Sequence, residues 1–320
     1  MSALLRALRR RILTPSISET SLDKRGFHKK SPAAQELLET VGRSFLDGYG
    51  HAVGTRNTEE LENCLSTVPD RFRGFAYEGA AMGATVLDAI PGTRGRRLAG
   101  LLAGEGRHHI YMAYVGIGWA LARLPRPLWP DLTGTDPLLR WLILDGYGFH
   151  QAYFHTDRYV HARLPGTPPW PWGPAGYPQR AVDQGIGRAL WFVAGTDPDL
   201  AATLIEKFPE ERRADLFSGT GLAAAYACGA REDELARLLH RAGPHRPQLL
   251  QGAAFAAEAR EKAGLTVDRT RLSVRALTGL DPADAALVCR RTRPTGPIAG
   301  DSYEQWRRQI SDELISRGDR

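Results

Sequence analysis

The chain has 320 residues, of which 42% are hydrophobic and 24% are charged, and its formal net charge is +6 at pH 7. That length can bury the core of one repeat-built domain or of two ordinary domains, and the hydrophobic content excludes a wholly disordered chain. The positive charge could suit a polyanion, but the arginines are spread along the chain and no aromatic–basic reader motif occurs, so we expect no nucleic-acid partner.

The first thirteen residues predict a short, basic, amphipathic helix. Its apolar and basic positions are Leu4, Leu5, Leu8 and Leu13 against Arg6, Arg9, Arg10 and Arg11. The long apolar core of a signal peptide is missing, and no stretch approaches the roughly 18 apolar residues that cross a bilayer. We expect these leucines to pack on the body of the protein; the alternatives are peripheral membrane contact through the N-terminus or docking on a partner.

The cysteines point to a reducing environment. Cys64, Cys228 and Cys289 lie far apart, are odd in number and form no CxxC motif. Neither a disulfide framework nor a zinc site is indicated, and we expect a cytoplasmic protein.

Helical patterns dominate the rest of the chain, and period-2 strand patterns bounded by turns are not found. The sequence predicts helices over residues 33–53, 57–66, 70–89, 107–123, 137–161, 178–194, 197–207, 210–228, 231–241, 246–263, 281–292 and 302–317. The proline-rich stretch 164–178 is expected to form an extended loop, either a lid or a rigid connector. We divide the chain into a basic N-terminal segment (1–31), a helical repeat domain (32–295) and a C-terminal helix that packs on it (296–320).

A glycine mark, Gly-x-(Gly/Ala), recurs in the predicted helices. Its first glycines are 30 to 39 residues apart: Gly48, Gly79, Gly116, Gly146, Gly185, Gly219 and Gly252. In four units an arginine precedes the mark by six residues: Arg73, Arg140, Arg213 and Arg246. Glycine inside a helix costs about 1 kcal/mol relative to alanine, and we expect close helix–helix approach to offset that cost. The mark predicts an all-α fold, an α-hairpin repeat array that is either an open solenoid or a closed helical toroid.

A polar residue precedes most of the marked glycines. These residues are Asp47, Glu78, Asp145, Gln184, Ser218 and Gln251, and Val115 is the exception. Equivalent positions of a repeat array align on one surface, so these side chains predict a polar ladder. One interpretation is a structural ladder that fixes the register of the repeats; the other is a polar-lined binding chamber. Arg73 and Arg140 point about 140° away from the polar residues of their own helices, so we expect them to meet carboxylates of a neighbouring unit.

The segment from Gly146 to His161 is the richest in histidine and aromatic residues. His150 and His155 are five residues apart, the wrong spacing for two ligands on one helix face, and no HExxH motif occurs, so no metal is expected. Histidine titrates near neutrality, so either one is a candidate acid or base; packed core histidines are the alternative. No Walker loop or GxSxG elbow occurs, and Gly185-x-Gly187 does not follow a strand, so no cofactor is expected.

Several longer motifs are distinctive: TPSISET (14–20), RFRGFAYEGAAMG (71–83), DGYGFH (145–150), DQGIGRALWFV (183–193), FPEERRADLFSG (208–219) and QGAAFAA (251–257). With them the chain, over about residues 14–312, resembles a bacterial family of unknown biochemical function. The enediyne branch of that family belongs to the core cassette of enediyne antibiotic gene clusters, beside the iterative polyketide synthase and its thioesterase. The resemblance implies a role in converting a linear conjugated polyene into the enediyne core, and it carries over no catalytic residues.

Two functional hypotheses follow. The first is an enzyme of cyclase or isomerase type acting on a polyketide-derived polyene, with Glu78 and Asp145 as acid or base, His150 as a proton relay, and Arg73 and Arg140 orienting the carboxylates. The further substrate-binding candidates are Asp47, Tyr147, Tyr153, His155, Gln184, Trp191 and Gln251. The second hypothesis is a non-catalytic binding or scaffold protein that organises other enediyne cassette proteins.

Overall fold

The computed structural model describes residues 3–90 and 95–318, and it forms helices and no strand over those residues. The predicted all-α class is therefore confirmed. Residues 1–2 of the predicted N-terminal segment and residues 319–320 of the predicted C-terminal segment lie outside the described residues. None of the helices in the described part of the chain is long and apolar enough to cross a membrane.

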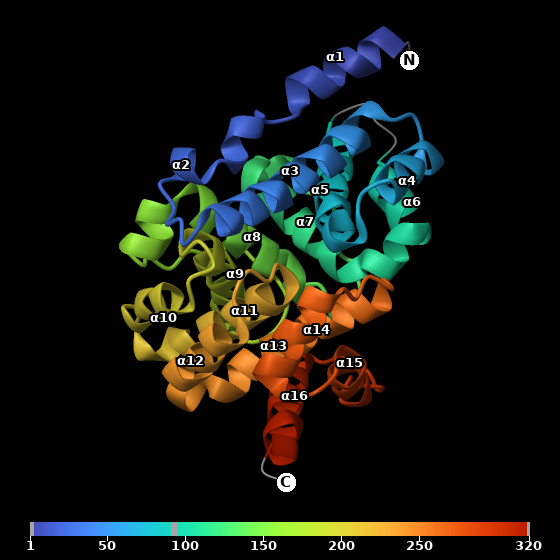
Figure 1. The fold of residues 1–320 in the computed structure, drawn as a ribbon. Coiled ribbons are helices and arrows are strands. Elements are labelled where there is room, and N and C mark those ends of the chain that lie inside the picture. The colour runs from blue at the N-terminus through green and yellow to red at the C-terminus, as the bar shows by residue number, and fades with distance from the viewer. Residues whose placement is uncertain (1–2, 91–94, 319–320) are drawn as a thin grey trace.

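The glycine marks lie on helices that pack in chain order, each against the next, and we call these helices the inner row (Figure 1). The predicted helix bounds agree with the structure to within a few residues over most of the row, but the helix predicted over 137–161 ends at Phe154. The inner row consists of α3 (Pro32–Gly54), α5 (Asp70–Asp88), α7 (Ile110–Arg123), α8 (Trp141–Phe154), α9 (Tyr177–Val193), α11 (Glu210–Tyr226) and α13 (Arg246–Lys262).

Four shorter helices connect successive members of the inner row: α4 (Thr58–Ser66), α6 (Arg97–Ala103), α10 (Pro198–Glu206) and α12 (Glu232–Ala242). A fifth, α14 (Asp268–Thr278), follows the last member of the row. In turn α12 contacts α10 and α14, so the linkers form a second layer. The connection from α7 to α8 carries only a short 3₁₀ turn, η3 (Arg126–Leu128), and that from α8 to α9 carries a π-helical turn, η4 (Asp157–His161). At the end of the chain, α15 (Pro282–Arg291) and α16 (Ser302–Gly318) pack on α13.

Each glycine mark brings two helices into backbone contact. A Cβ atom added to Gly146 of α8 would overlap the Val115 carbonyl of α7, and one added to Gly148 would overlap the Val182 carbonyl of α9. The same arrangement holds in α7, α9 and α11: the first glycine faces the preceding helix and the second faces the next. The close approach increases dispersion contact between helices, which offsets the helix-propensity cost of glycine as predicted.

Helix α3 departs from this register by two residues. A Cβ atom on Gly48 would overlap the Ala76 carbonyl of the next helix, whereas one on Gly50 would meet only the end of the Arg10 side chain. Gly79 of α5 in turn faces the carbonyl of Phe45. Phe45 therefore occupies the position that precedes the first glycine in the other helices. The prediction that Asp47 joins the polar ladder is wrong, and its side chain is exposed.

Three of the four recurring arginines bind the linker that precedes their helix. Arg73 and Arg213 each donate a hydrogen bond from Nε to the carbonyl five residues earlier, at 3.0 and 2.8 Å. Arg140 donates from Nη2 to the Thr135 carbonyl at 3.1 Å. Carbonyl groups near helix ends lack intrahelical donors, and arginine satisfies them. The expectation that Arg73 and Arg140 orient the Glu78 and Asp145 carboxylates is therefore wrong. Arg73 binds backbone carbonyls and the Asp70 carboxylate of its own helix, and Arg140 binds a backbone carbonyl.

The last helix of the inner row is hydrogen-bonded to the second and third helices, α5 and α7. Arg260 of α13 donates to the carbonyls of Asp70 and Arg71 at the start of α5, at 3.3 and 2.9 Å. Tyr111 of α7 donates its hydroxyl hydrogen to Glu258 of α13 at 3.1 Å. The row is therefore curled, and its inner surface encloses the space described below.

The N-terminal helix α1 (Ala3–Leu13) lies at one edge of the molecule, where it contacts α3 (Figure 1). It turns an arginine toward α3: Arg9 donates from Nε to the Val53 carbonyl at 2.5 Å. Leu4 and Leu8 are 79% and 51% exposed, so the expectation that the leucines of this helix pack on the body is wrong for them. The chain then passes through η1 (Ile17–Thr20) and the short helix α2 (Leu22–Arg25) before α3 begins.

Candidate functional site

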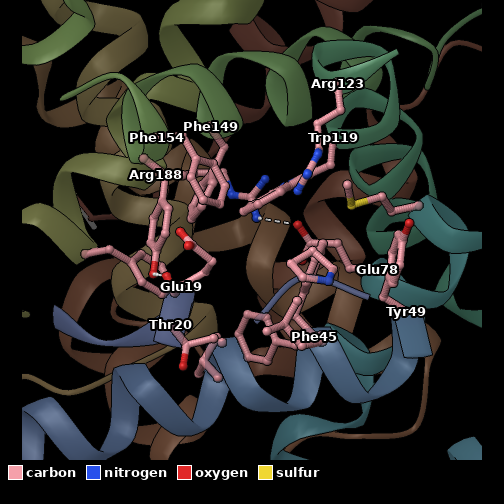
Figure 2. A pocket seen from close by; sticks show the side chains of 18 residues that line it. Glu19, Thr20, Phe45, Tyr49, Glu78, Trp119, Arg123, Phe149, Phe154 and Arg188 are labelled. Atoms are coloured by element: carbon pink, nitrogen blue, oxygen red, sulfur yellow. Dashed lines mark hydrogen bonds and ion pairs between the residues drawn. The ribbon is translucent and has the colours of Figure 1, made fainter. Parts of the chain in front are cut away.

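An apolar slot lies between the N-terminal members of the inner row (Figure 2). Its walls are mainly aromatic side chains from α3, α5, α7, α8 and α9: Phe45, Tyr49, Phe75, Trp119, Phe149, Tyr153, Phe154 and Phe192. The charged side chains among its lining residues are Glu19, Glu78, Arg123 and Arg188. We call this space the first slot.

The first slot is narrow. Its empty volume is about 680 Å³ when the open mouth is included, and most of that space lies close to the lining side chains. Ligand sites are usually apolar cavities with a few placed polar groups, and the first slot has that composition. A thin, flat molecule suits its shape better than a bulky one.

The segment that follows α1 covers one side of the first slot. Pro15, Glu19 and Thr20 contribute to its lining. A Cβ atom added to Gly42 of α3 would lie 2.8 Å from the Thr20 Cβ, so the segment sits directly on the α3 backbone. Tyr153, which lines the slot from α8, reaches the Glu19 carbonyl through its hydroxyl at 3.5 Å.

Glu78 of α5 is the buried carboxyl group of the first slot, with 3% of its surface exposed. The pKa of Glu78 is raised to about 7: burial is the main cause and the nearby Asp145 carboxylate adds to it, while Arg188 and Trp119 oppose the shift. Figure 2 shows Glu78 and Arg188 directed toward each other, with 3.9 Å between Oε1 and Nη2. A carboxyl group with a pKa near 7 can both donate and accept a proton at neutral pH.

Arg188 of α9 links Glu78 to the next carboxylate of the ladder. It donates from Nη1 to Oδ1 of Asp145 at 2.5 Å, and Gln184 donates from Nε2 to Oδ2 of the same carboxylate at 2.7 Å. Burial alone would lower the pKa of Arg188, but the Asp145 and Glu78 carboxylates outweigh it and raise that pKa. Asp145 is thus held as the partner of a permanent cation, whereas Glu78 lies farther from it.

A second apolar slot lies on the other side of Arg188. Its lining includes Asp145 and Arg188 together with Tyr111, Val115, Tyr226, Phe255, Tyr303 and Trp306, and its empty volume is about 420 Å³. Arg188 lines both slots, whereas Glu78 lines the first and Asp145 the second. The Glu78–Arg188–Asp145 group therefore separates two apolar spaces inside the curled row.

Hydrogen bonds hold the C-terminal half of the ladder in place. Ser218 donates its hydroxyl hydrogen to Oε1 of Gln251 at 2.8 Å, and Arg307 of α16 donates to the same oxygen at 3.0 Å. Arg307 also donates to Oδ1 of Asp215 at 2.7 Å. These contacts tie α11, α13 and α16 together, which matches the structural interpretation of the ladder in this half.

The chain matches the model of one protein family. A family model described as "Protein of unknown function (DUF1702)" matches residues 4–314. The chain belongs to this family. The description of the DUF1702 family states no activity and does not mention enediyne assembly. No curated protein and no solved structure matches the chain.

Among the predicted site residues, the structure brings Glu78, Asp145 and Gln184 together around Arg188. Tyr153 lines the first slot. Gln251 is buried in the Arg307 network described above.

His150 does not join this group. It packs edge-on against Trp119, with 5.4 Å between the ring centroids, and it is not among the residues that line the first slot. Burial lowers the pKa of His150 to about 3, with smaller contributions from Arg123 and His155, so the ring is neutral at physiological pH. A buried neutral histidine beside a tryptophan matches the packed-core alternative better than a proton relay.

The other predicted binding residues lie away from the first slot. His155 is exposed and lines a separate, more polar cleft that also contains Lys24, Arg25 and Asp157. Trp191 is fully buried and donates from Nε1 to the Cys228 carbonyl at 2.9 Å. Tyr147 is half-buried and packs against the main core. No three histidine, cysteine, aspartate or glutamate side chains in the described part of the chain gather as metal ligands would.

The sequence reasoning missed Arg188 and the aromatic walls, although a signal for them is present. The residues four positions after the ladder positions face the same way on their helices. Several of these residues line the first slot: Tyr49, Met82, Trp119, Phe149 and Arg188. Others line the second slot: Arg188, Leu222 and Phe255. These residues form a second row beside the ladder, and from the predicted ladder itself only Glu78 and Asp145 line a slot.

Proposed function

We propose that the chain binds a slim, conjugated, apolar molecule in the first slot and moves protons on it through Glu78. The observation that carries this proposal is a buried carboxyl group, with a pKa raised to about 7, that faces an otherwise aromatic slot. The substrate class that we propose is the linear conjugated polyene of enediyne assembly, which the motif resemblance implies. Such a molecule is thin and flat, and aromatic side chains stack favourably on extended π systems.

The proposed chemistry needs no oxidant. Glu78 in its ionised form takes a proton from a carbon adjacent to the conjugated chain, so that the C–H bond breaks and its electron pair delocalises along the chain. The protonated Glu78 then returns the proton at another carbon, and the double bonds shift. Arg188, at 3.9 Å from Glu78, stabilises the negative charge that develops during the transfer. Asp145 and Gln184 position Arg188 and do not contact the substrate in the first slot.

Deuterium exchange tests the proposal. The purified chain is incubated in D₂O with a synthetic linear conjugated pentaene that ends in a methyl group, and mass spectrometry follows deuterium incorporation. We expect exchange that Glu78→Gln reduces by about 100-fold or more, the usual contribution of a general base. The matched control is Asp47→Asn, which changes an exposed carboxyl group of α3 and should leave exchange unchanged. Wild-type rates in the Glu78→Gln protein would contradict the role of Glu78.

A second candidate function is a carrier that binds the polyene without changing it. Two observations favour a carrier: the Asp145 carboxylate is already hydrogen-bonded to Gln184 and Arg188, and His150 does not line the slot. Of the three predicted catalytic residues, Glu78 alone lines the first slot. Fluorescence enhancement of a conjugated tetraene fatty acid measures binding alone. Saturable binding together with no wild-type exchange would favour a carrier that delivers the polyene to other cassette proteins.

A further inference from the structure

Exposed apolar side chains are concentrated at the N-terminus. Five of the nine large hydrophobic side chains that are exposed in the described part of the chain lie before residue 18: Leu4, Leu5, Leu8, Ile12 and Ile17. The other four are scattered: Ile90, Leu128, Leu164 and Leu287. Single exposed apolar residues are ordinary on a protein surface, whereas a contiguous group indicates an interaction site.

Three of these side chains form a stripe along α1. Leu4, Leu8 and Ile12 follow one another at intervals of four residues, so they lie on one face of the helix, and they are 79%, 51% and 70% exposed. We call them the α1 stripe. A helix that packs on a protein normally turns its apolar face inward. In α1 this face is turned to solvent.

Arginine side chains hold α1 in this orientation. Arg9 donates to the carbonyls of Val53 and Thr55 at 2.5 and 3.4 Å, where α3 ends. The carboxyl end of a helix carries partial negative charge, and it favours a cation. Arg10 lies along Gly54 of the same helix, where a Cβ atom would come within 3.2 Å of its Cδ. The outward direction of the α1 stripe is thus fixed by the contacts on the opposite side of α1.

We propose that α1 binds the surface of an anionic membrane, with the α1 stripe inserted among the lipid chains and Arg11 against the headgroups. The helix contains four arginines and no acidic residue, and Arg11 is exposed. Amphipathic helices with this combination of apolar and basic faces lie in membrane interfaces. Three side chains are fewer than the 20 to 30 residues, roughly 800 Å² per partner, of a stable protein interface, so the observations favour lipid over a second protein.

The location of α1 gives this contact a consequence for the first slot. The chain runs from Leu13 directly into Pro15, Glu19 and Thr20, which line the slot. A molecule docked through α1 therefore holds this side of the slot near the lipid, where an apolar ligand would concentrate. This consequence rests on the proposed function, but the membrane contact itself does not.

Vesicle sedimentation of the full chain tests the membrane contact. We expect binding to mixed phosphatidylcholine and phosphatidylglycerol vesicles, weaker binding to phosphatidylcholine alone, and loss of binding at high salt because exposed charges are screened. The double variant Leu8→Glu, Ile12→Glu should weaken partition by about tenfold or more, because it places charge on the buried face of an interfacial helix. The matched control is Leu287→Glu, an exposed leucine of α15.

Three results would overturn the membrane proposal: no vesicle binding by the wild type, unchanged binding by the double variant, or a wild-type dimer that the double variant converts to a monomer. The last result would assign the α1 stripe to a second copy of the chain. Binding of the conjugated tetraene fatty acid without vesicles is measured in the same variants. Failure of that binding in the wild type would contradict the slot function alone, so the two proposals can fail separately.

Discussion

Burial of Glu78 in the folded chain changes the pH at which its carboxyl group ionises. Its pKa is raised to about 7 in the folded chain, first by burial, whereas the ordinary value of 4.5 applies when the chain is unfolded. The folded state therefore binds more protons than the unfolded state between these two pH values. A state that binds more protons is favoured at low pH, so the contribution of Glu78 to stability is present below pH 4.5 and is lost as pH rises through 7.

Glu78→Gln should remove this pH dependence. The amide has nearly the same shape and does not ionise. We therefore expect the free energy of unfolding of the variant to increase, relative to that of the wild type, as pH rises. A shift of this size corresponds to about 2.5 kcal/mol between pH 5 and pH 8. Urea unfolding at a series of pH values measures the difference. A difference that stays constant, or that shrinks toward high pH, would contradict the raised pKa of Glu78.

At the residue scale, the sequence identified the ladder better than it identified the partners of the ladder. Glu78, Asp145 and Gln184 were found because a polar residue before a helical glycine is unusual. Arg188 was missed because an arginine four residues later is an ordinary helix residue, and its role depends on the packing of α8 against α9. His150 was chosen for its chemistry, but burial makes it neutral, and burial is not visible in a local motif.

At the element scale, glycine and proline residues predict the positions of most of the helices. Glycine marks and helix-starting prolines are local signals, and the helices predicted from them agree well with the structure. Helices α6 and α14 were missed, as was the four-residue α2. The first is seven residues long and contains Gly100, and the second is rich in arginine and β-branched residues. Such segments have weak helical preference alone and form helices because packing stabilises them.

The backbone contact between α3 and α5 makes a specific prediction for two neighbouring glycines. Alanine is usually better than glycine in a helix by about 1 kcal/mol. Gly48→Ala should nevertheless destabilise the chain by roughly 1–3 kcal/mol, because the new methyl group overlaps the Ala76 carbonyl and must separate the helices. Gly50→Ala meets only the end of the Arg10 side chain and should be neutral or slightly stabilising.

Chemical denaturation of the two glycine variants distinguishes these effects, because both changes add the same methyl group to the same helix. Equal effects of the two substitutions on the free energy of unfolding would show that helix propensity dominates over the contact with α5.

At the scale of the whole molecule, Arg260 closes the curled row. Its guanidinium group donates to carbonyls on two different helices, those of Asp70 and Arg71 on α5 and that of Tyr226 on α11, the last at 2.8 Å. The residues that it joins are up to 190 positions apart in the sequence. Loss of this side chain would remove three hydrogen bonds from a buried cation, and the bond to the buried Tyr226 carbonyl alone is worth about 1.5–3 kcal/mol.

Arg260→Met should therefore lower the free energy of unfolding by about 3 kcal/mol. Hydrogen exchange should become faster in the first turns of α5 and the last turn of α11, and it should stay unchanged in the middle of α9. Arg246→Met, which alters an exposed arginine on the same helix, is the control and should change stability by less than about 0.5 kcal/mol. A uniform increase of exchange along the chain would mean that Arg260 stabilises the fold without closing the row.

The backbone contacts of the inner row also limit how the molecule can change its ligand. A glycine of one helix faces a carbonyl of its neighbour at each successive interface from α3 to α13, so backbone thickness sets the distance between these helices. A cavity framed by such helices cannot be enlarged by sliding its walls apart. Family members that bind a thicker ligand would need smaller side chains at aromatic positions such as Phe149 or Trp119, and they would retain the glycines.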